Sequence, residues 1–142
     1  MKPKLLIDTN IFVSYLLSKN IFPYKVVKEF FQENLVEHYI SHETSAEYQD
    51  VLSRNKFTKY APDFISLAKD LMQDILDLSV LVHPSTHFNI IEDNNDNAFL
   101  DVVFESSANY LVTGNSKHFK DKQFYTTQIV SAKEFCEINQ PV

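Results

Sequence analysis

The sequence predicts an α/β protein of three layers, α/β/α, in which helices cover both faces of a central parallel sheet, and a single domain over residues 1–142. Two observations carry this prediction. Short apolar runs without alternation, such as Leu5–Ile7 and Tyr110–Val112, suit strands that are buried on both faces. These runs alternate with longer stretches that carry apolar residues at helical spacing, and right-handed crossovers through such helices bring the strands together in parallel.

The predicted elements follow this alternation along the whole chain. Strands are expected at residues 5–7, 36–40, 80–82, 110–113 and 128–130. Helices are expected at residues 11–17, 24–33, 42–54 and 62–78, from a cap at Asn94 or Asn95 to residue 106, and after Ser131, with a further turn near residues 56–60. Pro23 is expected to open the second helix, because proline suits a helix start. Ser41 and Ser131 are expected to cap theirs, because a hydroxyl accepts hydrogen bonds from free N–H groups.

The composition bounds the function. The formal net charge of −6 argues against broad electrostatic binding of nucleic acid, although carboxylates that hold metal ions would themselves supply negative charge. The one glycine, Gly114, excludes the glycine-rich phosphate loops of Rossmann and P-loop proteins. No apolar run reaches the roughly 20 residues that span a bilayer, and no signal-peptide pattern is present. With a single cysteine, Cys136, the expected location is the cytoplasm, with no membrane partner.

Asp8 is the first candidate site residue. It follows the apolar run Leu5–Ile7, so it is expected at the carboxyl end of a buried strand, where open α/β sheets bind their ligands. Thr9 or Asn10 can cap the helix that follows, since both side chains accept hydrogen bonds from backbone N–H groups. Asp8 serving only as a cap for that helix is the alternative interpretation.

Asp96 gives the sharpest signal of a buried charge. At about 100° per residue its direction falls on the apolar face of its helix, among Phe99, Leu100, Val103 and Phe104. A carboxylate aimed at the core is costly unless it is paired or binds a metal. Asp101 and Glu105 turn away from that face, so we expect both to be solvated.

The helix at residues 42–54 carries three acids along one flank, Glu43, Glu47 and Asp50. The pattern does not choose among them, because a charged stripe beside an apolar one is also typical of a solvated face.

A second strand end, the corner Thr113–Asn115, completes the predicted site. It repeats the design of the first segment, because polar side chains follow a short apolar strand. Asp8, Asp96 and this corner are expected to meet at one edge of the sheet. Oxygen ligands of this kind suit Mg²⁺ or Mn²⁺, which would polarise a phosphodiester and lower the pKa of a bound water. The five histidines show no metal-ligand spacing, and no serine lies in a nucleophile-elbow sequence.

Three segments resemble the PIN-domain ribonucleases, in particular the bacterial PIN-domain toxins. They are Leu6–Asn10, then Ser45–Leu52 with Arg54 and Lys56-Phe57 behind it, and Asp93–Asp101 followed by Ala108–Gly114. Together they lie within residues 5–119, nearly the whole chain.

The resemblance implies an endoribonuclease that cuts single-stranded RNA with Mg²⁺ or Mn²⁺ held by acidic residues. Asp8 matches the first acid, Glu47 the second and Asp96 the third, so Glu47 is preferred over its two neighbours on this resemblance alone. Thr9, Asn10, Thr113 and Asn115 would orient water or phosphate. The family also implies a small antitoxin protein as partner, and a homodimer.

Asn115 departs from the family pattern, because it occupies the place of the usual fourth acid and cannot supply charge. That leaves open the number of metal ions, and it leaves an alternative, a catalytically degenerate PIN scaffold that only binds RNA or a protein. Lys117, Lys120 and Lys122 are candidates for holding the substrate, with solubility as the simpler explanation of the lysines. A phosphatase or phosphotransfer domain is disfavoured, because Asn10 lies where its second aspartate is expected.

Overall fold

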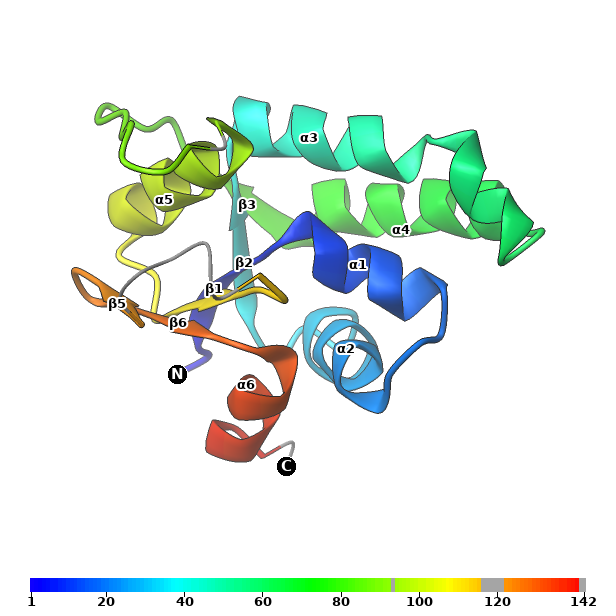
Figure 1. Ribbon diagram of the computed structural model, residues 1–142. Coiled ribbons are helices and arrows are strands. Elements are labelled where there is room, and N and C mark those ends of the chain that lie inside the picture. Colours follow the sequence, from blue (N-terminus) through cyan, green and yellow to red (C-terminus); the bar gives the residue numbers. More distant parts are fainter. Residues whose placement is uncertain (93, 116–121, 141–142) are drawn as a thin grey trace.

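Six strands form one sheet in the computed structural model, which describes residues 1–92, 94–115 and 122–140. The order across the sheet is β3-β2-β1-β4-β6-β5 (Figure 1). The strands are β1 Lys4–Ile7, β2 Glu37–Ile40, β3 Ser79–Leu81, β4 Tyr110–Val112, β5 Gln123–Phe124 and β6 Thr127–Val130. Neighbours pair in parallel except β5 and β6, which form an antiparallel hairpin. The five predicted parallel strands are confirmed. The sequence pattern does not predict β5, because two residues show no periodicity.

The helices fill the connections between these strands. They are α1 Thr9–Leu16, α2 Ile21–Tyr24, the π-helix η1 Lys25–Phe31, α3 His42–Leu52, the 3₁₀-helix η2 Asn55–Lys59, α4 Phe64–Leu78, α5 Asn94–Ser106 and α6 Ala132–Ile138.

Helix starts show where local capping decides the boundary. Ser41 and Ser131 cap α3 and α6 as predicted. The prediction that Pro23 opens the second helix is wrong, because α2 already begins at Ile21 with Asn20 accepting a hydrogen bond from the backbone N–H of Phe22 at 3.0 Å. Pro23 lies in the first turn, where a missing N–H costs nothing.

Two further capping predictions are wrong. Asp8, rather than Thr9 or Asn10, occupies the position before α1, and its side chain makes no capping hydrogen bond. The prediction that Asn94 or Asn95 caps α5 is wrong, because the helix already includes both residues.

Helices cover both faces of the sheet, which confirms the three-layer prediction. α6 and η1 pack together on one face, with the rings of Phe30 and Phe135 5.0 Å apart, and α5 covers the other (Figure 1). α3 and α4 pack along each other and extend to one side as an arm that contains η2. Phe12 of α1 joins the arm to η1, because its ring contacts both Tyr48 and Phe31.

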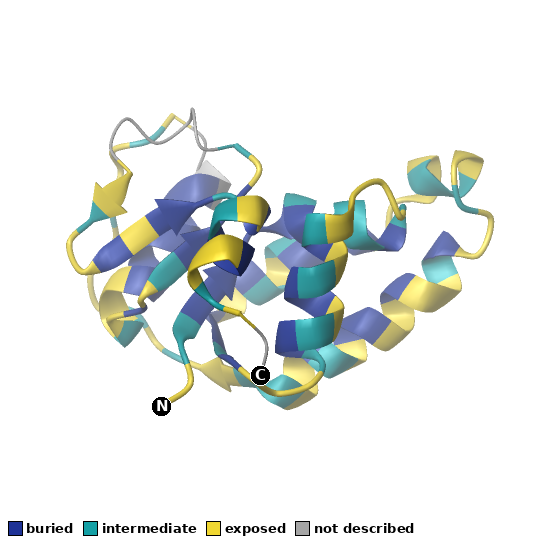
Figure 2. Cartoon of the chain, turned by 90° about the horizontal axis from the view of Figure 1, so that it is seen from below, coloured by how far each residue is buried: buried dark blue, intermediate teal, exposed yellow. Residues whose placement is uncertain are grey.

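Burial is concentrated in the strands and the inner faces of the helices, whereas η2 is largely exposed (Figure 2). Leu5, Leu6 and Ile7 are fully buried, as expected of a central strand. None of the described helices is long and apolar enough to cross a membrane.

The topology fixes where a site can form. From β1 the chain moves to β2 and β3 on one side, then returns to β4 on the other side of β1. The carboxyl ends of β1 and β4 therefore flank a topological switch point, where open α/β sheets leave a crevice. Ile7 is in register with Val112, so the next residues, Asp8 and Thr113, emerge side by side.

Candidate functional site at the carboxyl ends of the strands

Asp8 lies at this switch point and is almost completely buried, with 5% of its surface exposed. Its backbone N–H donates to the carbonyl of Val112 at 2.9 Å, which extends the β1–β4 pairing by one residue. Its carboxylate accepts a hydrogen bond from the hydroxyl of Thr113 at 2.6 Å. The chain therefore buries a carboxylate where a ligand would enter.

Thr113 organises the corner after β4. Besides donating to Asp8, its Oγ1 accepts a hydrogen bond from the backbone N–H of Asn115 at 3.0 Å. The next residue, Gly114, donates its N–H to Oδ1 of Asn10 at 3.2 Å. These bonds join the first turn of α1 to the corner, so the predicted convergence of Asp8 with Thr113–Asn115 is observed. Asn115 itself is half-buried.

Glu47 is the acid of α3 that the structure brings toward Asp8. Its Oε2 accepts a hydrogen bond from the hydroxyl of Thr9, and its charge acts on Asp8. Glu43 and Asp50 are exposed, and Asp50 pairs with Arg54 at 2.9 Å. The difference in burial thus distinguishes Glu47 from the other two acids, which sequence periodicity could not do.

Asp96 is buried in the first turn of α5, with 6% of its surface exposed, as its position on the apolar face predicts. Its charge also acts on Asp8. The first turn of a helix favours a negative charge, which offsets part of the cost of burial.

Electrostatics link the three carboxylates. The pKa of Asp8 is raised from 3.8 to about 6, with burial as the largest cause and the negative charges of Asp96 and Glu47 as further causes. The hydrogen bond that Thr113 donates lowers the pKa of Asp8, and the nearby backbone N–H of Asn10 lowers it as well. A raised pKa means that no positive charge compensates the ionised form of Asp8. A bound cation would supply that charge.

The donor set suits a hard divalent cation, because it consists of carboxylate, hydroxyl and amide oxygens. Among the residues that the structure describes, however, no three His, Cys, Asp or Glu side chains are arranged to hold a metal ion together. Mg²⁺ is commonly held by one or two carboxylates and keeps several waters, so it does not require such a group. Asp8 with Asp96 or Glu47 therefore fits a hydrated ion better than a fully enclosed one.

The expectation that Asp101 is solvated is wrong. Asp101 is 5% exposed and accepts hydrogen bonds from the backbone N–H of Phe88 at 2.7 Å and from Nδ1 of His87 at 3.3 Å. The segment ahead of α5 folds over this flank of the helix. Its neighbour Glu105 is exposed as expected and accepts the N–H of Ser85 at 2.9 Å.

Phe104 also differs from the prediction, because 37% of its surface is exposed although it was expected on the apolar face. Its ring contacts Phe88 and Tyr125 rather than the core between α5 and the sheet.

The lysines predicted to hold substrate are only partly described. Lys122 is exposed and lies near α6, where the backbone hydrogen bond from Ser131 is the main cause that lowers the pKa of Glu134 and the charge of Lys122 lowers it further. Lys117 and Lys120 fall outside the described residues.

A buried chain of polar groups behind the site was not found from the sequence. The ring of His38 in β2 is fully buried and contacts the hydroxyl of Ser79 at 2.7 Å and that of Tyr48 at 3.4 Å. The Tyr48 hydroxyl in turn donates to the carbonyl of Ile7. This bond ties the residue after Glu47 to the residue before Asp8. Burial lowers the pKa of His38 from 6.5 to about 3, so the ring is neutral.

The fold and the site define a class of protein, an open α/β domain with an acidic, partly buried site beyond the carboxyl ends of its parallel strands. A family model described as PIN domain matches residues 4–117. The chain therefore belongs to the PIN-domain family, whose members are generally nucleases that use divalent metals.

Two known proteins are similar to this chain over most of their lengths. An uncharacterized protein of Methanocaldococcus jannaschii is 30% identical over 146 residues, which cover 96% of this chain and 92% of that protein. The crystal structure of VapBC2 from Rickettsia felis, bound to a DNA fragment from its promoter, contains a chain with the same fold at a TM-score of 0.57 and 19% identity. That match covers 89% of this chain and 96% of the other.

Proposed function

We propose that this protein is a metal-dependent endoribonuclease that cleaves single-stranded RNA in the cytoplasm. The observation that carries the proposal is the buried carboxylate of Asp8, which Thr113 holds at the switch point of a PIN-family sheet and on which the charges of Glu47 and Asp96 act. A bound Mg²⁺ or Mn²⁺ would supply Lewis acidity to the phosphodiester and would make a coordinated water more acidic.

Each residue of the site has a distinct part in this proposal. Asp8, together with Asp96 or Glu47, would hold a hydrated cation through carboxylate oxygens, and the remaining carboxylate of the three would act on it through a coordinated water. Thr113 would fix the orientation of Asp8, and Thr9 would fix that of Glu47, through the hydrogen bonds described above. The amides of Asn10 and Asn115, at the outer side of the corner, would donate hydrogen bonds to water or to a phosphate oxygen.

We also infer that the protein is the toxin of a toxin–antitoxin pair, with a small antitoxin as partner and a homodimer as its assembly. This part of the proposal is supported by the family match together with the structural likeness to a chain of the VapBC2 complex.

Cleavage of a labelled single-stranded RNA in Mn²⁺ tests the proposal. We expect EDTA to abolish cleavage, and Asp8→Asn to reduce it by at least about a hundredfold, because an interaction with the transferring group is lost. Asp50→Asn changes an exposed carboxylate of α3 and is the control for surface charge. Cleavage that persists both in EDTA and in Asp8→Asn would overturn the metal-nuclease proposal.

The second candidate is a PIN scaffold that binds RNA or a protein without cutting. The specific observation in its favour is Asn115, a neutral residue where the family places an acid. Wild-type protein that binds RNA but neither binds Mn²⁺ nor cleaves would favour this candidate.

A further inference from the structure

A hollow of about 460 Å³ continues outward from the candidate site. Asn10, Thr113, Gly114 and Asn115 belong both to the site and to the wall of this hollow. From there it runs between α1, α2 and α6 to two exposed lysines, Lys19 and Lys133, and we refer to it as the lysine pocket.

The charge of the lysine pocket is opposite to that of the protein. None of the described residues that line it is acidic, and its charged side chains are Lys19 and Lys133, whereas the whole chain has a net charge of −6. The three carboxylates of the site do not line it. A ligand that extends from the carboxylates into the pocket would therefore meet a change of sign along its length.

Two amides in the wall present their donor groups. Oδ1 of Asn10 accepts the N–H of Gly114, and Oδ1 of Asn20 accepts the N–H of Phe22. With both oxygens bonded to the backbone, the NH₂ groups of these amides are the parts that can serve a ligand. A pocket that offers hydrogen-bond donors and ammonium groups, with no carboxylate among them, is typical of a site for an anion.

We propose that the lysine pocket binds the backbone phosphates of the RNA strand on one side of the bond that is cut. This inference rests on the proposed nuclease function and names the surface by which the site holds its substrate. The chemistry selects phosphates rather than bases, because lysines and amide donors contact the backbone without reading sequence. The pocket therefore contributes affinity that does not depend on sequence.

The outer end of the pocket supports the same path. Nζ of Lys19 lies 6.0 Å from the ring centroid of Tyr60, whose surface is 69% exposed. An exposed aromatic ring beside a lysine is a surface on which an unpaired base stacks, which a single strand offers and a duplex does not.

The test measures binding in the absence of catalysis. A fluorescent single-stranded RNA is titrated in EDTA against the Asp8→Asn protein, with anisotropy as the readout over a range of salt concentrations. Removing both ammonium groups, as Lys19→Ala with Lys133→Ala, is expected to weaken binding about tenfold and to reduce the slope of log affinity against log salt by about 1.4, two phosphates at roughly 0.7 each. Lys19→Arg with Lys133→Arg should keep the slope of the parent.

The matched control removes two exposed lysines that lie outside the pocket, Lys28 in η1 and Lys69 in α4. We expect this control to keep the affinity and the slope of the parent. Equal losses in both double variants would overturn the proposal, since net charge alone would then explain them. A parent that does not bind the RNA, or a pocket variant that matches the parent, would overturn it as well.

Kinetics separate this inference from the function on which it rests. In the protein with Asp8 intact, loss of the two pocket lysines is expected to raise KM with little change in kcat, because ground-state and transition-state binding weaken together. If cleavage persists both in EDTA and in Asp8→Asn, the proposed function fails while the binding comparison still stands. If cleavage depends on Asp8 but the pocket variants bind like the parent, only the pocket assignment fails.

Discussion

Two buried threonines lie at opposite ends of the sheet and make hydrogen bonds of the same length to very different acceptors. Thr127, at the amino end of β6, donates to the backbone carbonyl of Ala108 at 2.6 Å. Thr113, just beyond the carboxyl end of β4, donates at 2.6 Å to the carboxylate of Asp8. The first bond satisfies an ordinary backbone carbonyl. The second is made to a carboxylate whose ionised form is disfavoured by burial and by two neighbouring carboxylates.

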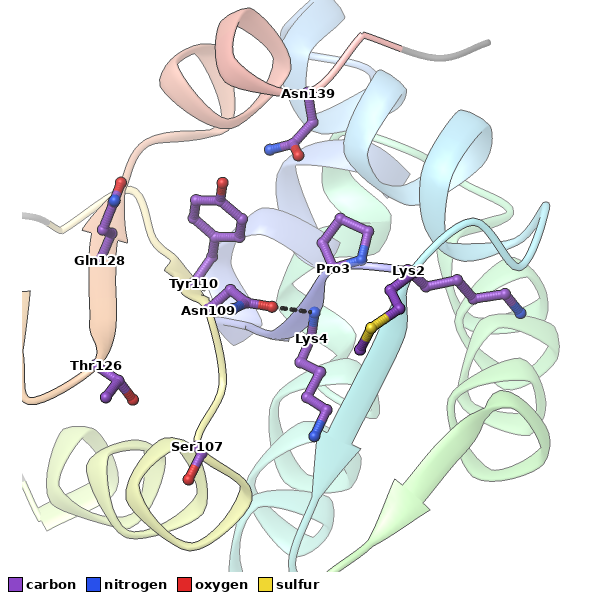
Figure 3. A pocket seen from close by; sticks show the side chains of 10 residues that line it. Lys2, Pro3, Lys4, Ser107, Asn109, Tyr110, Thr126, Gln128 and Asn139 are labelled. Carbon is purple, nitrogen blue, oxygen red and sulfur yellow. Dashed lines mark hydrogen bonds between the residues drawn. The ribbon is translucent and has the colours of Figure 1, made fainter.

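The amino end of the sheet shows what a structural polar region looks like in this protein. A hollow of about 510 Å³ lies there, lined by Lys2, Lys4, Asn109, Tyr110 and other residues (Figure 3). The backbone N–H of Lys4 donates to Oδ1 of Asn109 at 2.9 Å, so a side chain again completes the backbone pairing. Polar groups at this end complete the fold, and those at the carboxyl end hold charges that reduce its stability. We therefore expect the carboxyl end to govern activity and the amino end to govern stability.

The largest effects should come from two buried aspartates on one helix. Asp96→Asn is expected to reduce cleavage at least about a hundredfold and to leave the melting temperature in EDTA unchanged or raised, because repulsion with Asp8 is relieved. Asp101→Asn is expected to keep activity but to lower the free energy of unfolding by about 1–3 kcal/mol, because Asp101 holds the N–H of Phe88 and the ring of His87.

Cleavage assays and thermal melts on both variants check this pair. Both side chains are about equally buried, so burial alone cannot explain opposite outcomes. An inactive Asp101→Asn beside an active Asp96→Asn would contradict the assignment of the site.

The next effect is a pH dependence of stability that belongs to Asp8. Its pKa is about 6 in the folded protein against 3.8 for the free group, so its contribution to stability is fully present below about pH 3.8 and is lost as the pH rises through 6. Relative to wild type, Asp8→Asn in EDTA should therefore gain on the order of 3 kcal/mol between pH 4 and pH 7.

The contribution of His38 to stability depends on pH with the opposite sign to that of Asp8, and over an overlapping range of pH. Its pKa of about 3 in the folded protein means that the stability contributed by its neutral ring is present above about 6.5 and is lost as the pH falls toward 3. Both proteins contain His38, so its contribution cancels in the difference between them. Urea unfolding at several pH values supplies that difference, and parallel curves for the two proteins would show that Asp8 is not the group concerned.

The two threonines test the comparison of the sheet ends most directly. Thr127→Val should lower the free energy of unfolding by about 1 kcal/mol and leave kcat/KM unchanged. Thr113→Val should reduce kcat/KM about tenfold or more and raise the pKa of Asp8 further, because a hydrogen bond to the ionised form is lost. Equal effects of both substitutions on activity would remove the distinction between the two ends.

The smallest effect is expected at Asn115. Asn115→Asp would add a fourth negative charge to the site, so we expect Mn²⁺ to bind about tenfold more tightly and the metal-free protein to be less stable. Asn55→Asp on the exposed arm adds the same charge elsewhere and serves as control. Calorimetric titration with Mn²⁺ and thermal melts in EDTA measure both halves, and an unchanged affinity would place Asn115 outside the site.

Local sequence patterns correctly predicted a central strand, two helix starts and the direction of one buried side chain. The fully apolar run of β1 identified a central strand, serine hydroxyls identified the starts of α3 and α6, and helical periodicity directed Asp96 toward the interior. Periodicity could not separate Glu47 from Glu43 and Asp50, because the choice depends on how α3 lies against α1. The resemblance to PIN-domain toxins was needed there.

The missed burial of Asp101 has a physical cause, which is the fold of a segment without periodicity. Helical periodicity gives the direction of Asp101 relative to the core, but it does not show that residues 87 and 88 return over the opposite flank of α5. The burial of His38 likewise depends on Ser79 and Tyr48, which reach it from other elements.

The hydrogen bond between Asp8 and Thr113 spans 105 residues of sequence, and β4 cannot pair with β1 until that length of chain exists. During synthesis Thr113, which orients the carboxylate of Asp8, leaves the ribosome 105 residues after it. Contacts of such separation also form late in folding, because loop closure must precede them. A nascent chain of the proposed ribonuclease should therefore remain inert toward the message that encodes it until Thr113 has emerged and joined the sheet.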